Sequence, residues 1–172
     1  VFDQNIEIAK IEFEELRKKL PQIPKLSEVV NTLGGNRHFM IELKQKCTPD
    51  QISILKKTLQ PLNEIEDFHF MSLDLDRFEN LIDFDKKTFV SIARTNIQSI
   101  FKQSLEKDIG GFTGQYFLLS DSMLRQCHKK NIQVGTGFPD SKNLLFREAN
   151  RSVNWVFTNK AVQLAQMKSN HS

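Results

Sequence analysis

The sequence is poor in several features that mark common protein classes. It holds only two cysteines, Cys47 and Cys127, and neither lies in a CxxC motif or beside a histidine at metal-ligand spacing. We therefore expect two reduced thiols and neither a disulfide framework nor a zinc site. The sequence also lacks an apolar run of the roughly 18–20 residues that a membrane helix needs, so we expect no transmembrane segment.

Two further absences concern nucleic acids and nucleotides. The net charge is only +3 and no basic run is interleaved with aromatic residues, so we expect no nucleic-acid partner. No GxGxxG or Walker motif follows a candidate strand, which disfavours a nucleotide-binding sheet. What is present is a chain of 172 residues, 39% hydrophobic and 26% charged, which is enough to build the core of one ordinary domain.

Predicted strands and helices alternate six times along the chain. Such alternation indicates parallel strands joined by right-handed helical crossovers, and both a doubly wound open sheet and a (β/α) barrel fit it. The strands are expected at residues 38–44, 68–73, 88–93, 115–119, 132–136 and 153–158, and the helices at 49–59, 74–82, 97–105, 120–130, 140–149 and 160–167.

Local signals predict several element ends. The pair Gly34-Gly35 ends a short helix expected at residues 27–33. Thr48 is placed to cap a helix that starts at Pro49, and Gln51 is placed to bond back to the cap.

The first predicted strand, HFMIELKQ, carries two charges on one face. Phe39, Ile41 and Leu43 form an apolar face, and Met40, Glu42 and Lys44 form the other face. In a barrel the apolar face meets the helices and the other lines the lumen, with functional residues at the C-terminal strand ends. The residues alone also allow Glu42 and Lys44 to be an ion pair that fills the interior.

Five segments, taken in order, resemble the glycerophosphodiester phosphodiesterase family. They are IPKLSEVV (23–30), MIELK (40–44), MSLDLDRFENL (71–81), LSDSMLRQCHKKNIQVGT (119–136) and VNWVFTNKAVQL (153–164). The resemblance implies a TIM (β/α)8-type barrel, of which this chain holds the last six βα units. Residues 1–22 then correspond to the tail of the family's small insertion, residues 23–168 to the partial barrel and residues 169–172 to a C-terminal tail.

The resemblance also implies a chemistry, the metal-dependent hydrolysis of a glycerophosphodiester to glycerol 3-phosphate and an alcohol. Glu42 falls where the family has a glutamate ligand to a divalent cation, Mg²⁺ or Ca²⁺, which prefers carboxylate oxygens. Lys44 falls where the family places a lysine near the phosphate. Ser72, Thr136 and Trp155 are further candidate substrate-binding residues.

Other parts of the family pattern are absent. The upstream His-Arg and Glu-x-Asp motifs and the second acid/base histidine have no counterpart, and the histidines of this chain match no catalytic position, so no catalytic residue is identified. Residues 135–138 read Gly-Thr-Gly-Phe where the family has Trp-Thr-Val-Asn, and residues 158–159 read Thr-Asn where it has Thr-Asp. The four histidines are His38, His69, His128 and His171.

These gaps lead to three expectations. The parent protein hydrolyses a small-molecule glycerophosphodiester, but this segment alone does not. The exposed edges of its sheet are covered by the missing N-terminal part or by another chain. The alternatives are a degenerate, non-catalytic homologue that acts as a binding module, a phospholipase D-like member of the same barrel group, and an unrelated α/β domain with accidental matches.

Overall fold

A single curled sheet of parallel strands forms the centre of the computed structural model, which describes residues 6–163 and 166. Its six strands follow one another in the order of the chain, and each pairs in parallel with the next. They are β1 (Phe39–Glu42), β2 (Phe68–Ser72), β3 (Phe89–Ile92), β4 (Gly111–Gln115), β5 (Gln133–Gly137) and β6 (Trp155–Phe157).

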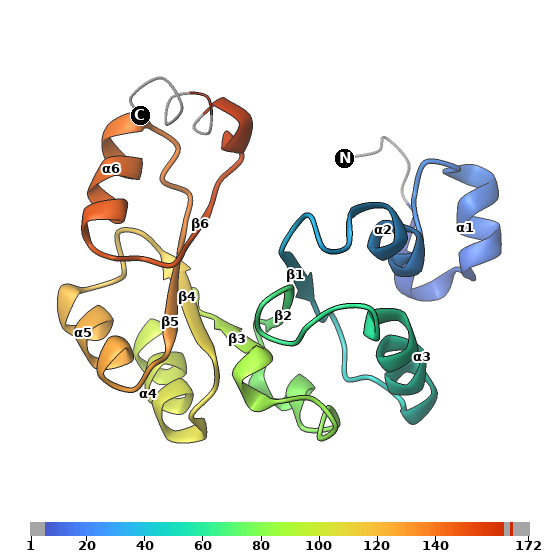
Figure 1. Cartoon of the computed structure of the whole chain (residues 1–172), viewed down its shortest axis with the longest axis horizontal. Helices are drawn as coiled ribbons and strands as arrows, with labels where there is room; N and C mark the ends of the chain where they lie inside the picture. Colours follow the sequence, from blue (N-terminus) through green and yellow to red (C-terminus); the bar gives the residue numbers. More distant parts are fainter. Residues whose placement is uncertain (1–5, 164–165, 167–172) are drawn as a thin grey trace.

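The strand order decides between the two architectures. A doubly wound sheet reverses its order at a switch point, and no reversal occurs here. Right-handed crossovers in one direction place all helices on one side of the sheet, so that the sheet curls with the helices outside. Figure 1 shows this arrangement, and the predicted partial (β/α) barrel is confirmed. The first and last strands, β1 and β6, form the two edges.

Six α-helices and three short 3₁₀ helices connect or precede the strands in the described part of the chain. None of these helices has the length and hydropathy of a membrane span. The α-helices are α1 (Phe13–Lys19), α2 (Leu26–Leu33), α3 (Pro49–Leu59), α4 (Ile97–Lys107), α5 (Asp121–Lys129) and α6 (Lys142–Asn150), and the 3₁₀ helices are η1 (Ile8–Lys10), η2 (Leu75–Phe78) and η3 (Lys86–Thr88).

The predicted start of α3 is confirmed in detail. The Thr48 hydroxyl accepts a hydrogen bond from the Gln51 N–H (3.3 Å), and the Gln51 side chain accepts one from the Thr48 N–H (3.0 Å). Pro49 occupies the first helical position, where its missing N–H costs nothing. The short helix α2 ends at Gly34, also as predicted.

Two element predictions are wrong. The strand expected at residues 115–119 instead spans Gly111–Gln115, because Gly111 is a strand residue and not a break. A Cβ at Gly111 would lie 2.7 Å from Trp155 Cζ3, so the indole occupies the space of the missing side chain. The helix expected at residues 74–82 is only the 3₁₀ turn η2. Its buried residues Leu75 and Phe78 are three positions apart, which is the 3₁₀ period, and the buried Leu81 follows after three more.

Two predictions reach beyond the described residues. The last helix, expected at 160–167, is helical at residues 161–163, while 164, 165 and 167 lie outside the description. The C-terminal tail, 169–172, also lies outside it.

The main core lies between the sheet and its helices. Phe68, Phe70, Phe112 and Val134 point from the strands into one buried cluster with helix residues such as Ile100. Because side chains alternate along a strand, the neighbouring residues face the lumen. This alternation places Phe39, Ile41 and Leu43 against the core and Glu42 on the lumen side, as predicted.

The two cysteines belong to this core. Cys47 and Cys127 are both buried and free. Burial raises the pKa of the Cys127 thiol to about 12, so this thiol is protonated at neutral pH. Both therefore act as small apolar side chains.

Candidate functional site

A cavity of about 560 Å³ lies at the C-terminal ends of the strands. We call it the mouth cavity. All six strands contribute a residue at or next to their last position: Glu42, Met71, Ile92, Gln115, Gly137 and Phe157. In (β/α) barrels this face carries the active site, whereas the opposite face serves stability. The mouth cavity is therefore the candidate functional site.

Glu42 and Lys44 line the mouth cavity together. The Lys44 ammonium lies 2.6 Å from Glu42 Oε1, and the two side chains are 73% and 34% exposed. The two side chains therefore form an ion pair, and in the part of the chain that the structure describes this pair lies at an open rim beside the edge strand β1. An ion pair this exposed contributes at most about 1 kcal/mol, so a ligand can separate it at low cost.

Arg94 is a third charged residue of the cavity, and it is not among the site residues predicted from the sequence. It lies directly after β3, and its backbone N–H donates to Asn96 Oδ1 (3.0 Å), which fixes the turn into α4. No carboxylate pairs with its guanidinium among the residues that the structure describes. The rule that singled out Glu42, a charge at a C-terminal strand end, also applies to Arg94.

The rest of the cavity wall is largely apolar. Met71, Leu73 and Ile92 cover one part, and Phe138 and Phe157 another. Phe138 has a positive φ of 65° and is 51% exposed, and its N–H donates to the Phe157 carbonyl (2.7 Å). A bulky residue rarely adopts this backbone conformation, and such strain is concentrated at functional sites.

The other candidate binding residues lie away from the mouth cavity. Ser72 and Thr136 are fully buried on the helix-facing side, in alternation with lumen residues. The Ser72 hydroxyl accepts from the Asp74 N–H (3.1 Å), which ties the strand to the turn that follows. Trp155 faces the lumen at a deeper level, where its ring lies 4.9 Å from that of His69.

Gly135 stands where the resemblance leads one to expect a tryptophan, and its surroundings leave no space for a side chain. A Cβ at Gly135 would lie 2.7 Å from Phe157 Cε2. Glycine at position 135 therefore leaves the volume that the Phe157 ring occupies. An indole at position 135 would collide with this ring.

None of the histidines that the structure describes lines the mouth cavity. His38 and His69 lie near the N-terminal ends of β1 and β2, with His69 Nδ1 2.9 Å from His38 Nε2. Burial, and less strongly the charge of His38, lowers the pKa of His69 to about 4. His128 is exposed on α5, and His171 lies outside the described residues. The described part of the mouth therefore offers no imidazole for acid/base chemistry.

The residues of the mouth cavity do not fit a divalent cation by themselves. Mg²⁺ and Ca²⁺ need several oxygen donors, and Glu42 is the single carboxylate that the described residues contribute to the lining. Among residues 6–163 and 166, no three His, Cys, Asp or Glu side chains gather as a metal-binding group. Glu42 can supply one ligand, and any others must come from outside this set.

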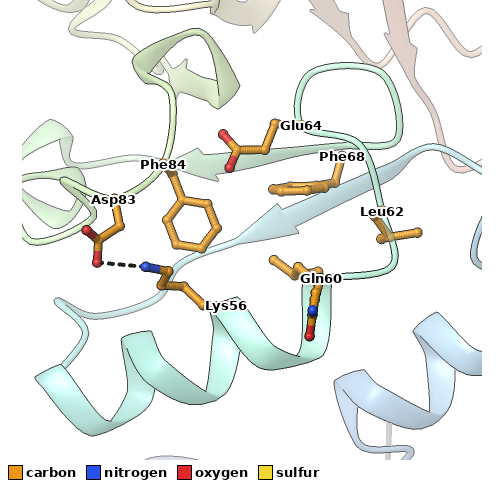
Figure 2. A pocket seen from close by; sticks show the side chains of 8 residues that line it. Lys56, Gln60, Leu62, Glu64, Phe68, Asp83 and Phe84 are labelled. Atoms are coloured by element: carbon orange, nitrogen blue, oxygen red, sulfur yellow. Dashed lines mark ion pairs between the residues drawn. The ribbon is translucent and has the colours of Figure 1, made fainter.

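A second cavity, of about 180 Å³, lies at the opposite face of the sheet (Figure 2). It is bordered by α3, by Phe68 at the start of β2 and by Phe84. Its charged groups are already engaged: Lys56 pairs with Asp83 (3.2 Å), and Glu64 accepts from the Asp85 N–H (2.8 Å). Its position and satisfied charges indicate a packing gap.

Solved structures share this fold. A Galdieria sulphuraria protein assigned to the glycerophosphodiester phosphodiesterases superposes with a TM-score of 0.75 and 16% identity, over 95% of this chain and 72% of that chain. A phosphodiesterase from Oleispira antarctica, in complex with its product sn-glycerol-3-phosphate, gives a TM-score of 0.72 and 15% identity, over 92% and 71%. A protein from Agrobacterium tumefaciens assigned to the same activity gives 0.66 and 12%, over 85% and 64%.

The likeness covers most of this chain but only part of each solved protein. This chain spans 64% of the length of the Agrobacterium protein, less than two thirds. No protein-family model matches the sequence, and no curated protein matches it. At 12–16% identity the likeness concerns the fold, and at that level it confirms the resemblance. The chain has the fold of the glycerophosphodiester phosphodiesterase barrel.

Proposed function

We propose that this chain is the larger part of a glycerophosphodiester phosphodiesterase barrel. The complete protein splits a glycerophosphodiester into glycerol 3-phosphate and an alcohol. The observation that supports this most is the joint placement of Glu42 and Lys44 on one cavity at the C-terminal strand ends. Those are the two positions at which the sequence resembles the family's metal-ligand and phosphate-binding residues.

Each of the two side chains has a defined role in this proposal. The Lys44 ammonium binds a phosphate oxygen and offsets the negative charge that grows there during hydrolysis. The Glu42 carboxylate would hold one side of a divalent cation, Mg²⁺ or Ca²⁺, and such a cation would offset the negative charge of the phosphodiester. The other cation ligands and the acid/base groups lie outside the described residues, on elements that cover the edges of β1 and β6.

The test is hydrolysis by the full-length natural polypeptide. Release of sn-glycerol 3-phosphate from a panel of glycerophosphodiesters is measured with Mg²⁺ or Ca²⁺ for the wild type and for Glu42→Gln and Lys44→Met. Both variants should lower kcat/KM by about 10²–10³-fold, the effect of removing one group that stabilises developing charge. Lys57→Met, an exposed lysine on α3, is the matched control and should leave the rate unchanged. Wild-type rates in both active-site variants would refute the assignment.

The isolated 172-residue chain should release no glycerol 3-phosphate in the same assay, because its mouth cavity lacks a histidine and a second carboxylate. Measurable hydrolysis by the isolated chain would contradict this part of the proposal.

The lack of a histidine and of a second carboxylate among the described residues of the mouth cavity favours a second candidate. This candidate is a non-catalytic barrel that binds glycerophosphodiesters. The two candidates differ in one result. A binding module would bind sn-glycerol 3-phosphate through Lys44, but the full-length polypeptide would turn over none of the panel.

A further inference from the structure

Among the described residues, the mouth cavity carries one charge that no side chain offsets. Its charged lining residues are Glu42, Lys44 and Arg94. Glu42 and Lys44 are in contact at 2.6 Å and compensate each other. The Arg94 guanidinium has no carboxylate partner among the described residues, so it remains available to a bound anion.

Arg94 and Lys44 approach the cavity from different strands. Lys44 follows β1 and Arg94 follows β3, with β2 between them. Neighbouring strands lie about 4.8 Å apart, so roughly 10 Å of sheet separates the two strand ends. One extended ligand can therefore place its phosphate at Lys44 and the far end of its alcohol group at Arg94.

We propose that Arg94 makes the mouth cavity selective for glycerophosphodiesters whose alcohol group carries an anion, either a carboxylate or a second phosphate. This inference rests on the proposed function and adds the substrate class. A guanidinium presents a rigid fork of donors that matches both anions in a bidentate contact. The bond from the Arg94 N–H to Asn96 holds the base of this side chain in place.

The mouth cavity offers fewer favourable contacts to a cationic alcohol group such as choline. The single lining carboxylate, Glu42, already faces Lys44. The rings of Phe138 and Phe157 can attract an ammonium, but this attraction is weak at exposed sites and weaker for phenylalanine than for tryptophan. The positive charge of Arg94 repels the ammonium of such a ligand, because like charges placed together disfavour binding.

The experiment compares three substrates with the full-length polypeptide. Glycerophosphoserine presents a carboxylate, glycerophosphoinositol 4-phosphate presents a second phosphate, and glycerophosphocholine presents a cation. The wild type should have a higher kcat/KM for at least one anionic substrate than for glycerophosphocholine. Arg94→Gln should lower the kcat/KM for that substrate about tenfold, equal to about 1.4 kcal/mol, and leave glycerophosphocholine unchanged or improved. The anionic substrate whose kcat/KM falls in Arg94→Gln identifies the anion, carboxylate or phosphate, that Arg94 binds.

Two further variants complete the test. Arg94→Lys keeps the charge without the fork and should recover part of the lost preference. Arg125→Gln removes an exposed arginine from α5 and should change nothing.

Three results would overturn the inference. An equal loss for all three substrates would place Arg94 on the shared phosphate, and no loss for any would remove it from binding. If the wild type hydrolyses none of the three, the proposed function fails and the selectivity fails with it.

Discussion

The histidine pair at the N-terminal end of the lumen predicts how stability depends on pH. His38 Nδ1 lies 2.8 Å from the Glu66 carbonyl oxygen, which can only accept, so this nitrogen carries the proton. His38 Nε2 then accepts from the Nδ1–H of His69 (2.9 Å). The remaining nitrogen, His69 Nε2, is buried without a hydrogen-bond partner. A proton on His69 Nε2 would therefore be buried without an acceptor.

The size of the effect follows from the pKa of His69. Burial lowers this pKa from 6.5 to about 4, so between these values the unfolded chain binds a proton that the folded chain does not. The free energy of unfolding is therefore highest above pH 6.5 and falls as the pH drops toward 4. At about 1.4 kcal/mol per pKa unit the full loss from His69 is about 3 kcal/mol.

Urea unfolding followed by circular dichroism at pH 7.5 and pH 5 measures this loss. His69→Phe keeps an aromatic ring beside Trp155 but cannot titrate, so it should lose about 2 kcal/mol less than the wild type between the two pH values. His128→Gln, at an exposed histidine, should behave as the wild type. Trp155 is the only tryptophan of the chain, so its fluorescence reports directly on the neighbouring ring. The same pH dependence in His69→Phe and the wild type would refute the reasoning.

Three further predictions concern packing, charge and capping, and each is measured by urea unfolding at pH 7.5. Gly111→Ala should lower the free energy of unfolding by about 1–3 kcal/mol, because the added Cβ would lie 2.7 Å from the Trp155 ring. The control Gly137→Ala, whose Cβ would have its nearest contact at 3.6 Å, should lower it less. Equal losses in the two variants would contradict the packing account. Arg151→Met should cost about 3 kcal/mol because it leaves the fully buried Glu148 with Arg147 alone, and a cost below 1 kcal/mol would show that the pair is dispensable. Thr48→Ala should cost about 1 kcal/mol by removing the cap of α3, and no change would mean that the cap is not needed.

Parallel strands and several element ends were predictable from the sequence because they depend on local patterns. Alternation of strand and helix patterns indicates parallel pairing, and short-range chemistry such as the Thr48 cap gives element ends. The alternation left the order of the strands open, and only the family resemblance favoured the barrel over the doubly wound sheet. The start of β4 was not predictable, because glycine usually interrupts a strand and the Trp155 ring that packs over Gly111 is distant in sequence. The turn η2 was predicted as part of an α-helix, and the three-residue spacing of Leu75 and Phe78 fits a 3₁₀ turn better.

The candidate site was predictable only in part. Glu42 and Lys44 were found because both the alternation in β1 and the resemblance point to them. Ser72 and Thr136 come from matched segments, but a match does not fix which way a strand residue faces, and a shift of one position reverses it. Arg94 lies between the matched segments, so only its place after β3 could have revealed it.

The most direct test of the central claim is a crystal structure of the full-length polypeptide with sn-glycerol 3-phosphate. The claim is that the mouth cavity between Glu42, Lys44 and Arg94 is the substrate site. We expect the phosphate within hydrogen-bond distance of Lys44 Nζ, with the Glu42–Lys44 pair separated. A phosphate bound elsewhere on the barrel, or a mouth cavity that holds none while Glu42 and Lys44 remain paired, would contradict the account.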